Sequence, residues 1–132
     1  MKILALDYGQ ENIGIAISDP TNSIAIPVSI VKNDKNLILY LKKFTNNNRV
    51  GEIIIGLNIS LSGKLGDENR KKMEIFSEKI SRLGIPIKFW DERLTTKIAN
   101  NIKREQHKRS DRNKKIDDIA AALILQNYLD SR

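Results

Sequence analysis

The sequence has no cysteine, one histidine, few aromatic residues and no long apolar run. The absence of cysteine excludes disulfides, thiolate metal sites and cysteine nucleophiles. The longest unbroken apolar run covers residues 119–125, far short of the ~18 residues needed to cross a bilayer. The apolar stretch at residues 3–6 is also too short for the core of a signal peptide. We therefore expect a cytoplasmic protein with no membrane partner.

The length of 132 residues is enough for one hydrophobic core of ordinary size and too short for two. Hydrophobic residues make up 40% of the chain and charged residues 30%, which is typical of globular proteins rather than disordered ones. We therefore expect residues 1–132 to fold as a single domain.

The net charge of +7 is concentrated in one segment of the chain. Residues 97–115 contain eight basic and two acidic residues, which gives this segment alone a net charge of +6. Such a cluster favours a polyanionic partner such as nucleic acid, and Lys108, Arg109 and Arg112 lie within it. The alternative is a solvated loop that only keeps the protein soluble. His107 also lies in this polar segment, and we assign it no catalytic role.

The hydrophobic pattern predicts three leading strands, followed by alternating helices and strands. The expected strands cover residues 3–7, 13–18, 23–31, 52–56 and 85–90. The expected helices begin after Asp34 as N-cap, at Asp67, near Thr95 or Thr96, and near Lys115. This order predicts a mixed α/β sheet with helices on both faces.

Several local details follow from the same pattern. Pro27 marks its strand as an edge or a bulge, and Gly84 stands where a helix C-terminal glycine is expected. Phe89 and Trp90 are expected in the core, and the basic residues 104–113 are expected to form a loop. The buried stripe of the last helix is expected to consist of Ile116, Ile119, Ala120, Leu123 and Ile124.

Acidic residues stand at two strand ends, where a ligand site is expected, and at the start of the last helix, whose packing could bring them to the same place. Asp7 ends the first strand, Asp91 and Glu92 end the strand that begins near residue 85, and Asp117 and Asp118 open the last helix. In open α/β sheets, ligands bind at the carboxyl ends of the strands, and a carboxylate there is costly to desolvate without a partner.

Each acidic position also has an ordinary structural interpretation. Asp7 could form a turn, Asp91 and Glu92 could pair with Arg93, and acids in the first turn of a helix interact favourably with its dipole. The occurrence of all three clusters favours a site. Converging carboxylates repel one another unless a cation lies between them, and oxygen ligands select Mg²⁺ or Mn²⁺. Two such ions can promote phosphodiester hydrolysis.

Four stretches together resemble the YqgF family of bacterial ribonuclease H-like proteins, described as pre-16S rRNA nucleases and relatives of Holliday junction resolvases. They are Leu-Ala-Leu-Asp-Tyr-Gly with Gly-Ile-Ala, Ile-Ile-Ile-Gly-Leu, Asp-Glu-Arg-Leu-Thr-Thr and Ile-Asp-Asp-Ile-Ala-Ala, at residues 4–9 with 14–16, 53–57, 91–96 and 116–121. The resemblance is collinear over essentially the whole chain. It implies that Asp7, Glu92 and Asp117 bind the catalytic metal, and it favours Asp117 over Asp118.

The resemblance implies a ribonuclease H-like fold and a metal-dependent nuclease that acts on structured RNA, in processing of the 16S rRNA precursor. Arg93 is then expected to contact phosphate or support the site. The alternatives are a Holliday junction resolvase acting on branched DNA and a non-catalytic RNA-binding factor of ribosome assembly. A resolvase must cut two strands symmetrically and so acts as a dimer, which leaves monomer and homodimer both open here.

Overall fold

The computed structural model describes residues 1–57, 67–91 and 113–132; within these ranges, it leaves out the side chains of residues 57, 67–69, 91 and 113–118. The described chain forms a five-stranded sheet in the order β3-β2-β1-β4-β5. The strands are β1 (Lys2–Asp7), β2 (Asn12–Ser18), β3 (Ala25–Lys32), β4 (Val50–Leu57) and β5 (Ile87–Asp91). The first three pair antiparallel as consecutive strands, while β1 with β4 and β4 with β5 pair parallel. The predicted mixed sheet with three leading strands is therefore confirmed.

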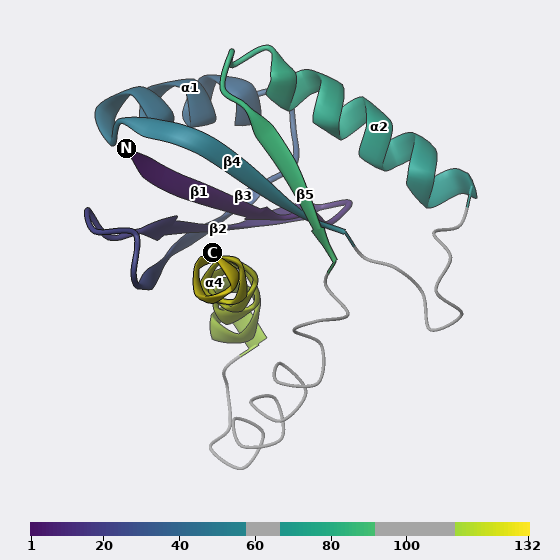
Figure 1. Cartoon of the computed structure of the whole chain (residues 1–132). Coiled ribbons are helices and arrows are strands. Elements are labelled where there is room, and N and C mark those ends of the chain that lie inside the picture. The colour runs from purple at the N-terminus through teal and green to yellow at the C-terminus, as the bar shows by residue number, and fades with distance from the viewer. Residues whose placement is uncertain (58–66, 92–112) are drawn as a thin grey trace.

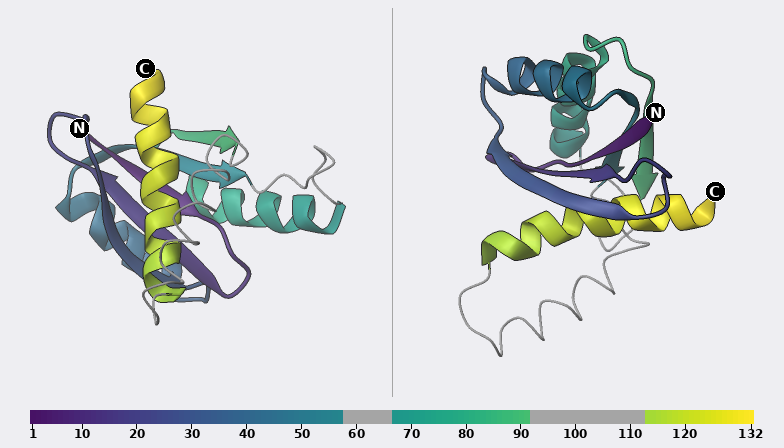
Figure 2. Two further views of the ribbon diagram at one scale, coloured as in Figure 1. Left: turned by 90° about the horizontal axis from the view of Figure 1, so that it is seen from below. Right: turned by 90° about the vertical axis from the view of Figure 1, so that its left-hand side faces the viewer.

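Helices cover both faces of this sheet, as predicted (Figure 1). Helices α1 (Leu37–Asn47) and α2 (Asp67–Ser81) lie on one face, and α4 (Asn113–Ser131) lies on the other. Both views of Figure 2 show α4 crossing its face with its N-terminal end on the side of the sheet where β1 ends. None of the helices in the described part of the chain is long and apolar enough to span a membrane.

Strand β1 lies at the centre of the sheet and divides two separate cores. Leu4 and Leu6 pack with the residues beneath α1 and α2, while Ile3 and Ala5 pack with α4. This alternation follows from the two-residue period of a strand, and both faces are apolar because helices cover both. The alternation places Asp7, at the last position of β1, on the α4 face.

Two predictions made from proline and glycine residues are confirmed. Strand β3 forms an edge of the sheet, and its pairing with β2 shifts by one residue next to Pro27. An edge position and a bulge both avoid the ladder hydrogen bond that proline cannot donate. Gly84 follows α2 with a φ of 75°, a left-handed conformation that glycine adopts without a steric penalty.

Two local predictions are wrong, and two others are not tested by the described residues. Asn36 rather than Asp34 is the N-cap of α1, and Asp34 instead accepts a hydrogen bond of 2.9 Å from the Asn36 backbone N–H. Phe89 is 46% exposed, because β5 is an edge strand with a neighbour on one side only. The predicted helix after residue 95 and the loop at 104–113 lie almost entirely outside the described residues.

The buried stripe of α4 also differs from the prediction. Ile124 is buried as predicted, but Ile119, Ala120 and Leu123 are only partly buried, and the side chain of Ile116 lies outside the described residues. The other buried residues of the described part of the helix are Ala121, Leu125, Tyr128 and Leu129. Residues 119–125 are all apolar, so their sequence carries no helical period from which a buried face could be identified.

The turn that follows Asp7 should be the part of the fold most sensitive to a single methyl group. A Cβ atom at position 9 would lie 2.5 Å from the backbone oxygen of Asn12, so we expect Gly9→Ala to lower the free energy of unfolding by roughly 1–3 kcal/mol. At Gly51 the nearest atoms to an added Cβ belong to the side chain of the exposed Met1, so Gly51→Ala should change the free energy of unfolding by less than about 1 kcal/mol. Denaturant titration of both variants tests this, and equal losses would contradict it.

Candidate active site

The parallel strands bring their carboxyl ends to one edge of the sheet. Asp7 at the end of β1 pairs with Gly56 of β4, Gly56 pairs with Trp90 of β5, and Leu57 pairs with Asp91. Neighbouring strands lie about 5 Å apart, so the ends of β1 and β5 are about 10 Å apart across β4. Asp7 and the backbone of Asp91 therefore lie at the same edge of the sheet.

Asp7 is partly buried on the face that α4 covers, at the point where the apolar side chains of β1 end. Its partners in the neighbouring strands are both glycines, Gly14 in β2 and Gly56 in β4. Because glycine has no side chain, no side chain lies directly opposite the Asp7 carboxylate on either side. Any side chain that contacts the Asp7 carboxylate must therefore come from a position other than these two.

The chain directly after Asp7 is held in place by contacts that the sequence did not predict. The ring of Tyr8 packs against Phe76 of α2 on the opposite face, with ring centroids 4.8 Å apart. The Asn33 side chain donates a hydrogen bond of 3.1 Å to the backbone oxygen of Gly9, and the Asn33 backbone N–H donates one of 2.8 Å to the backbone oxygen of Glu11. These contacts fix the path of the chain after Asp7. Asn33 lies 24 residues away in sequence, so no local pattern indicated this role.

Trp90 places an unsatisfied hydrogen-bond donor in the same row of the sheet as Asp7. Its indole packs edge-on against Tyr128 of α4, with ring centroids 5.4 Å apart and planes at 82°. Its Nε1–H is buried and finds no hydrogen-bond partner among the residues that the structure describes. An N–H group cannot ligate a cation, but it suits an anionic oxygen of a carboxylate or a phosphate. The sequence offered one signal for this role: the tryptophan directly precedes the acidic pair.

Helix α4 carries the third acidic cluster. The helix begins at Asn113, two residues earlier than predicted, so Asp117 and Asp118 lie in its second turn rather than its first. The helix-dipole interpretation is correspondingly weaker, since the dipole acts mainly on the first turn. Ala121 packs against the sheet face that carries Ala5 and Ala16, and these small residues allow the helix to approach the sheet closely.

Asp7 is the one predicted metal ligand whose side chain lies within the described residues. The structure gives Asp91, Asp117 and Asp118 by backbone alone, and the predicted site residues Glu92, Arg93, Lys108, Arg109 and Arg112 lie outside the described residues. Within the described side chains, no three of the His, Asp and Glu residues gather as a metal-binding group. The carboxylate at the strand end, in a chain without cysteine, fits hard cations such as Mg²⁺ and Mn²⁺.

Comparison with known proteins gives consistent results. Residues 1–131 match the sequence profile of the RuvX family, described as Holliday junction resolvase. Proteins provisionally named pre-16S rRNA nuclease are 40% identical in Thermoanaerobacter pseudethanolicus and 42% identical in Dictyoglomus turgidum. These alignments cover 100% and 99% of this chain and 98% and 95% of the relatives.

Solved structures establish the fold. The chain superimposes on Thermus thermophilus RuvC in complex with a Holliday junction substrate with a TM-score of 0.65 at 10% identity, covering 100% of this chain and 95% of that one. The Fowlpox virus resolvase in complex with Holliday junction DNA gives 0.58 at 17% identity, covering 99% and 98%. The ribonuclease H-like fold and the family resemblance seen in the sequence are thereby confirmed. On its match from residue 1 to residue 131 and on these relatives, the chain belongs to the RuvX family of nucleases.

Proposed function

We propose that this protein is a divalent-metal-dependent nuclease that hydrolyses phosphodiester bonds in structured RNA and processes the 5′ end of the 16S rRNA precursor during ribosome biogenesis. The observation that carries the proposal is the position of Asp7, at the shared carboxyl edge of three parallel strands and between two glycines. In the proposed site, Asp7, Glu92 and Asp117 hold Mg²⁺ or Mn²⁺. When bound, such ions neutralise charge on the phosphate and lower the pKa of an attacking water.

The alternation along β5 supports Glu92 rather than Asp91 as the second ligand. Lys88 and Trp90 contact Tyr128 of α4 and so lie on the same face as Asp7. Side chains along a strand alternate between faces, and a continuation of this alternation past the end of β5 would bring the α4 face to position 92. We therefore assign the ligand role to Glu92.

The rotation of α4 supports Asp117 rather than Asp118 as the third ligand. The Tyr128 side of the helix is directed toward β4 and β5, and the Gln126 side toward the start of β3. At 3.6 residues per turn, position 117 lies about three turns before Tyr128 on the same side of the helix. Position 118 lies about 100° further round, toward the Gln126 side. The strand ends that carry Asp7 and Glu92 belong to β1 and β5, which favours position 117.

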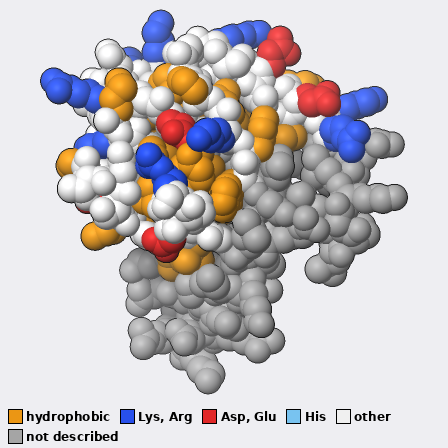
Figure 3. All heavy atoms as spheres, viewed as in Figure 1, with side chains coloured by type: hydrophobic (Ala, Val, Ile, Leu, Met, Phe, Trp, Pro, Cys, Tyr) orange, Lys and Arg blue, Asp and Glu red, His pale blue; other side chains and the backbone are white. Residues whose placement is uncertain are grey.

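The remaining roles belong to groups that contact the substrate. The Trp90 N–H has no hydrogen-bond partner among the described residues and is suited to donate to an anionic oxygen near the site, either a ligand carboxylate or a substrate phosphate. Arg93, Lys108, Arg109 and Arg112 are proposed to bind the phosphate backbone. In the view of Figure 3, the basic side chains of the described residues are spread over the surface rather than gathered into one patch. The segment of charge +6 is therefore the better candidate for the main electrostatic contact.

The choice of RNA follows the relatives in sequence. Relatives at 40% and 42% identity over the whole chain are named for precursor 16S rRNA, whereas the resolvase structures share only 10% and 17%. The second candidate is resolution of Holliday junctions, favoured by the description of the family. Only the second requires a dimer that cuts two strands, so the oligomeric state in solution discriminates between them. A non-catalytic RNA-binding factor would show no metal-dependent cleavage of either substrate.

The first test is cleavage by Asp7→Asn. The amide is nearly isosteric, so we expect the variant to remain folded and to lose more than about a hundredfold in rate, because the charge that holds metal is gone. The exposed Asp34→Asn is the matched control and should retain full activity. Precursor 16S rRNA and a four-way DNA junction are each incubated with Mg²⁺ and with Mn²⁺. A folded Asp7→Asn that cuts at the wild-type rate would refute the metal site.

The second test separates the two acids of α4. We expect Asp117→Asn to abolish cleavage and Asp118→Asn to retain most of it, because only position 117 lies on the Tyr128 side of the helix. Rates are measured on the same RNA at saturating Mg²⁺, with circular dichroism confirming the fold of each variant. Loss in Asp118→Asn alone would reverse the assignment, and equal losses would contradict it.

The third test concerns the basic segment. Changing Lys108, Arg109 and Arg112 together to Ser should weaken RNA binding broadly across sequences and lower the slope of log affinity against log salt by roughly two to three units, because each phosphate contact releases counterions. Metal binding should persist, since none of these side chains is a metal ligand. Fluorescence anisotropy at several salt concentrations measures the slope. An unchanged slope would mean that the segment is only a solvated surface.

A further inference from the structure

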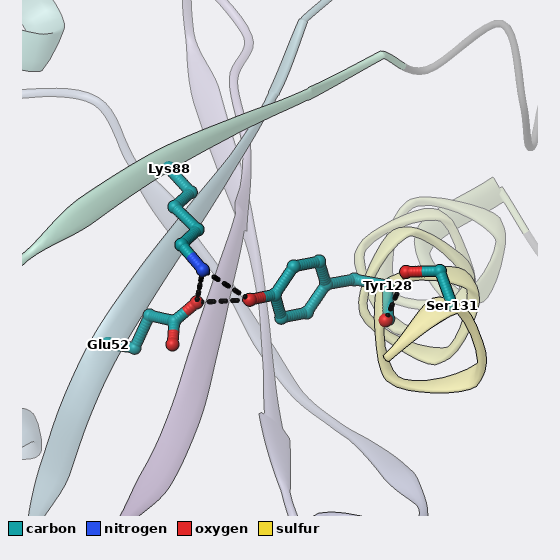
Figure 4. Close-up of polar contacts among 4 residues, drawn as sticks. All are labelled: Glu52, Lys88, Tyr128 and Ser131. Atoms are coloured by element: carbon teal, nitrogen blue, oxygen red, sulfur yellow. Dashed lines mark hydrogen bonds and ion pairs between the residues drawn. The ribbon is translucent and has the colours of Figure 1, made fainter.

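A polar contact joins the C-terminal half of α4 to the sheet. The Tyr128 hydroxyl donates a hydrogen bond of 2.5 Å to Glu52 of β4 and accepts one of 3.0 Å from Lys88 of β5 (Figure 4). Lys88 also lies 3.5 Å from the same carboxylate oxygen of Glu52. The pKa of Lys88 is raised by its bond to the Tyr128 hydroxyl and by the negative charge of Glu52. One residue of α4 thus binds both strands on this side of β1.

A second polar contact holds the opposite side of the same helix. The Gln126 side chain accepts a hydrogen bond of 2.9 Å from the backbone N–H of Ala25 and donates one of 3.0 Å to the backbone oxygen of Ser23. Gln126 and Tyr128 therefore hold α4 from the β3 side and from the β4–β5 side. Two anchors on opposite sides of a helix fix its rotation about its own axis.

Rotation of α4 is the quantity that its apolar contacts leave least determined. Residues 119–125 are apolar all round the helix, and the sheet residues beneath it are also apolar: Ile3, Ala5, Ala16 and Ile54. Apolar burial is non-directional, so neighbouring rotations would bury similar areas. Hydrogen bonds depend on direction and distance, and they select one rotation.

We propose that Tyr128, through its bonds to Glu52 and Lys88, is a positioning residue that sets the rotation of α4 and so directs position 117 toward the edge that carries Asp7. This inference rests on the proposed metal site. Positions 117 and 128 are separated by eleven residues, or about 16 Å along the helix. A rotation of about 20° would move a side chain at a radius of about 5 Å by about 2 Å. Metal and catalytic sites tolerate about 0.5 Å.

The hydrogen bonds of Tyr128 to Glu52 and Lys88 should contribute little to the stability of the fold. The Lys88 side chain is 60% exposed, and ion pairs at that exposure contribute little. The Tyr128 ring is buried against Trp90 and the α4 core, and this packing does not require the hydroxyl. Removing the hydroxyl should therefore leave the fold intact while releasing the rotation of the helix.

The test compares Tyr128→Phe with Ser131→Ala in the full chain. Tyr128→Phe keeps the ring and loses both bonds, whereas Ser131→Ala loses a bond of 2.7 Å that lies within α4. We expect Tyr128→Phe to lower Mn²⁺ affinity, measured by calorimetry, and kcat with Mg²⁺ by roughly tenfold each. RNA affinity without metal and circular dichroism should be unchanged. Ser131→Ala should match the wild type in all four measurements.

Two further measurements make the outcome specific. Trp90 is the single tryptophan and lies edge-on to Tyr128, so its emission should change in Tyr128→Phe and not in Ser131→Ala. Glu52→Ala removes the Tyr128–Glu52 bond by changing its acceptor. The double variant, Tyr128→Phe with Glu52→Ala, should lose no more Mn²⁺ affinity or kcat than either single variant. Unchanged Mn²⁺ affinity and kcat in Tyr128→Phe would overturn the positioning role while Asp7→Asn remains inactive. An active Asp7→Asn would instead refute the metal site itself.

Discussion

Strand β1 is covered by helices on both faces, and the structure of the site depends on this constraint. A strand in that position must be apolar along its whole covered length, because water cannot reach its side chains. Leu4 and Leu6 serve one core and Ile3 and Ala5 the other. Asp7 is the first residue at which the cover ends, so its carboxylate is held at a fixed height and on a fixed face by four buried neighbours. The strand thus supplies a rigid support for a charged group that the interior could not accept.

The two cores differ in the side chains that the sheet presents to its helices, and this difference affects how α4 is positioned. Beneath α1 and α2 the sheet presents mostly large aliphatic side chains. Beneath α4 it presents Ile3 and Ile54 together with the small residues Ala5 and Ala16, and Gly14 and Gly56 lie on either side of Asp7. Small residues permit a close approach but give little directional information. The proposed placement of α4 therefore relies on polar contacts at its two sides, and such precision matters for a helix that is proposed to carry a metal ligand.

The fold could be predicted from the sequence because each buried strand is a short apolar run that ends at a polar or flexible residue. The position of Asp7 followed from the same signal. The buried face of α4 could not be predicted, because an apolar run of seven residues has no period, and Phe89 was misassigned because sequence does not reveal which strand forms an edge. The roles of Asn33 and Trp90 depend on contacts between distant segments. Such contacts leave no trace in local composition.

The chemistry at the strand edge does not itself select between RNA and DNA. Carboxylates that hold divalent ions act on the phosphodiester, which the two polymers share, and a likeness to RuvC at 10% identity shows that the sheet is retained while the sequence changes almost completely. Discrimination requires groups that contact the 2′-hydroxyl, unpaired bases or the shape of a junction. The paired strand positions around Asp7 are glycines and offer no such groups. We therefore expect substrate choice to depend on residues outside these paired positions, and the most distinctive candidate in the sequence is the basic segment that precedes the acidic pair of α4.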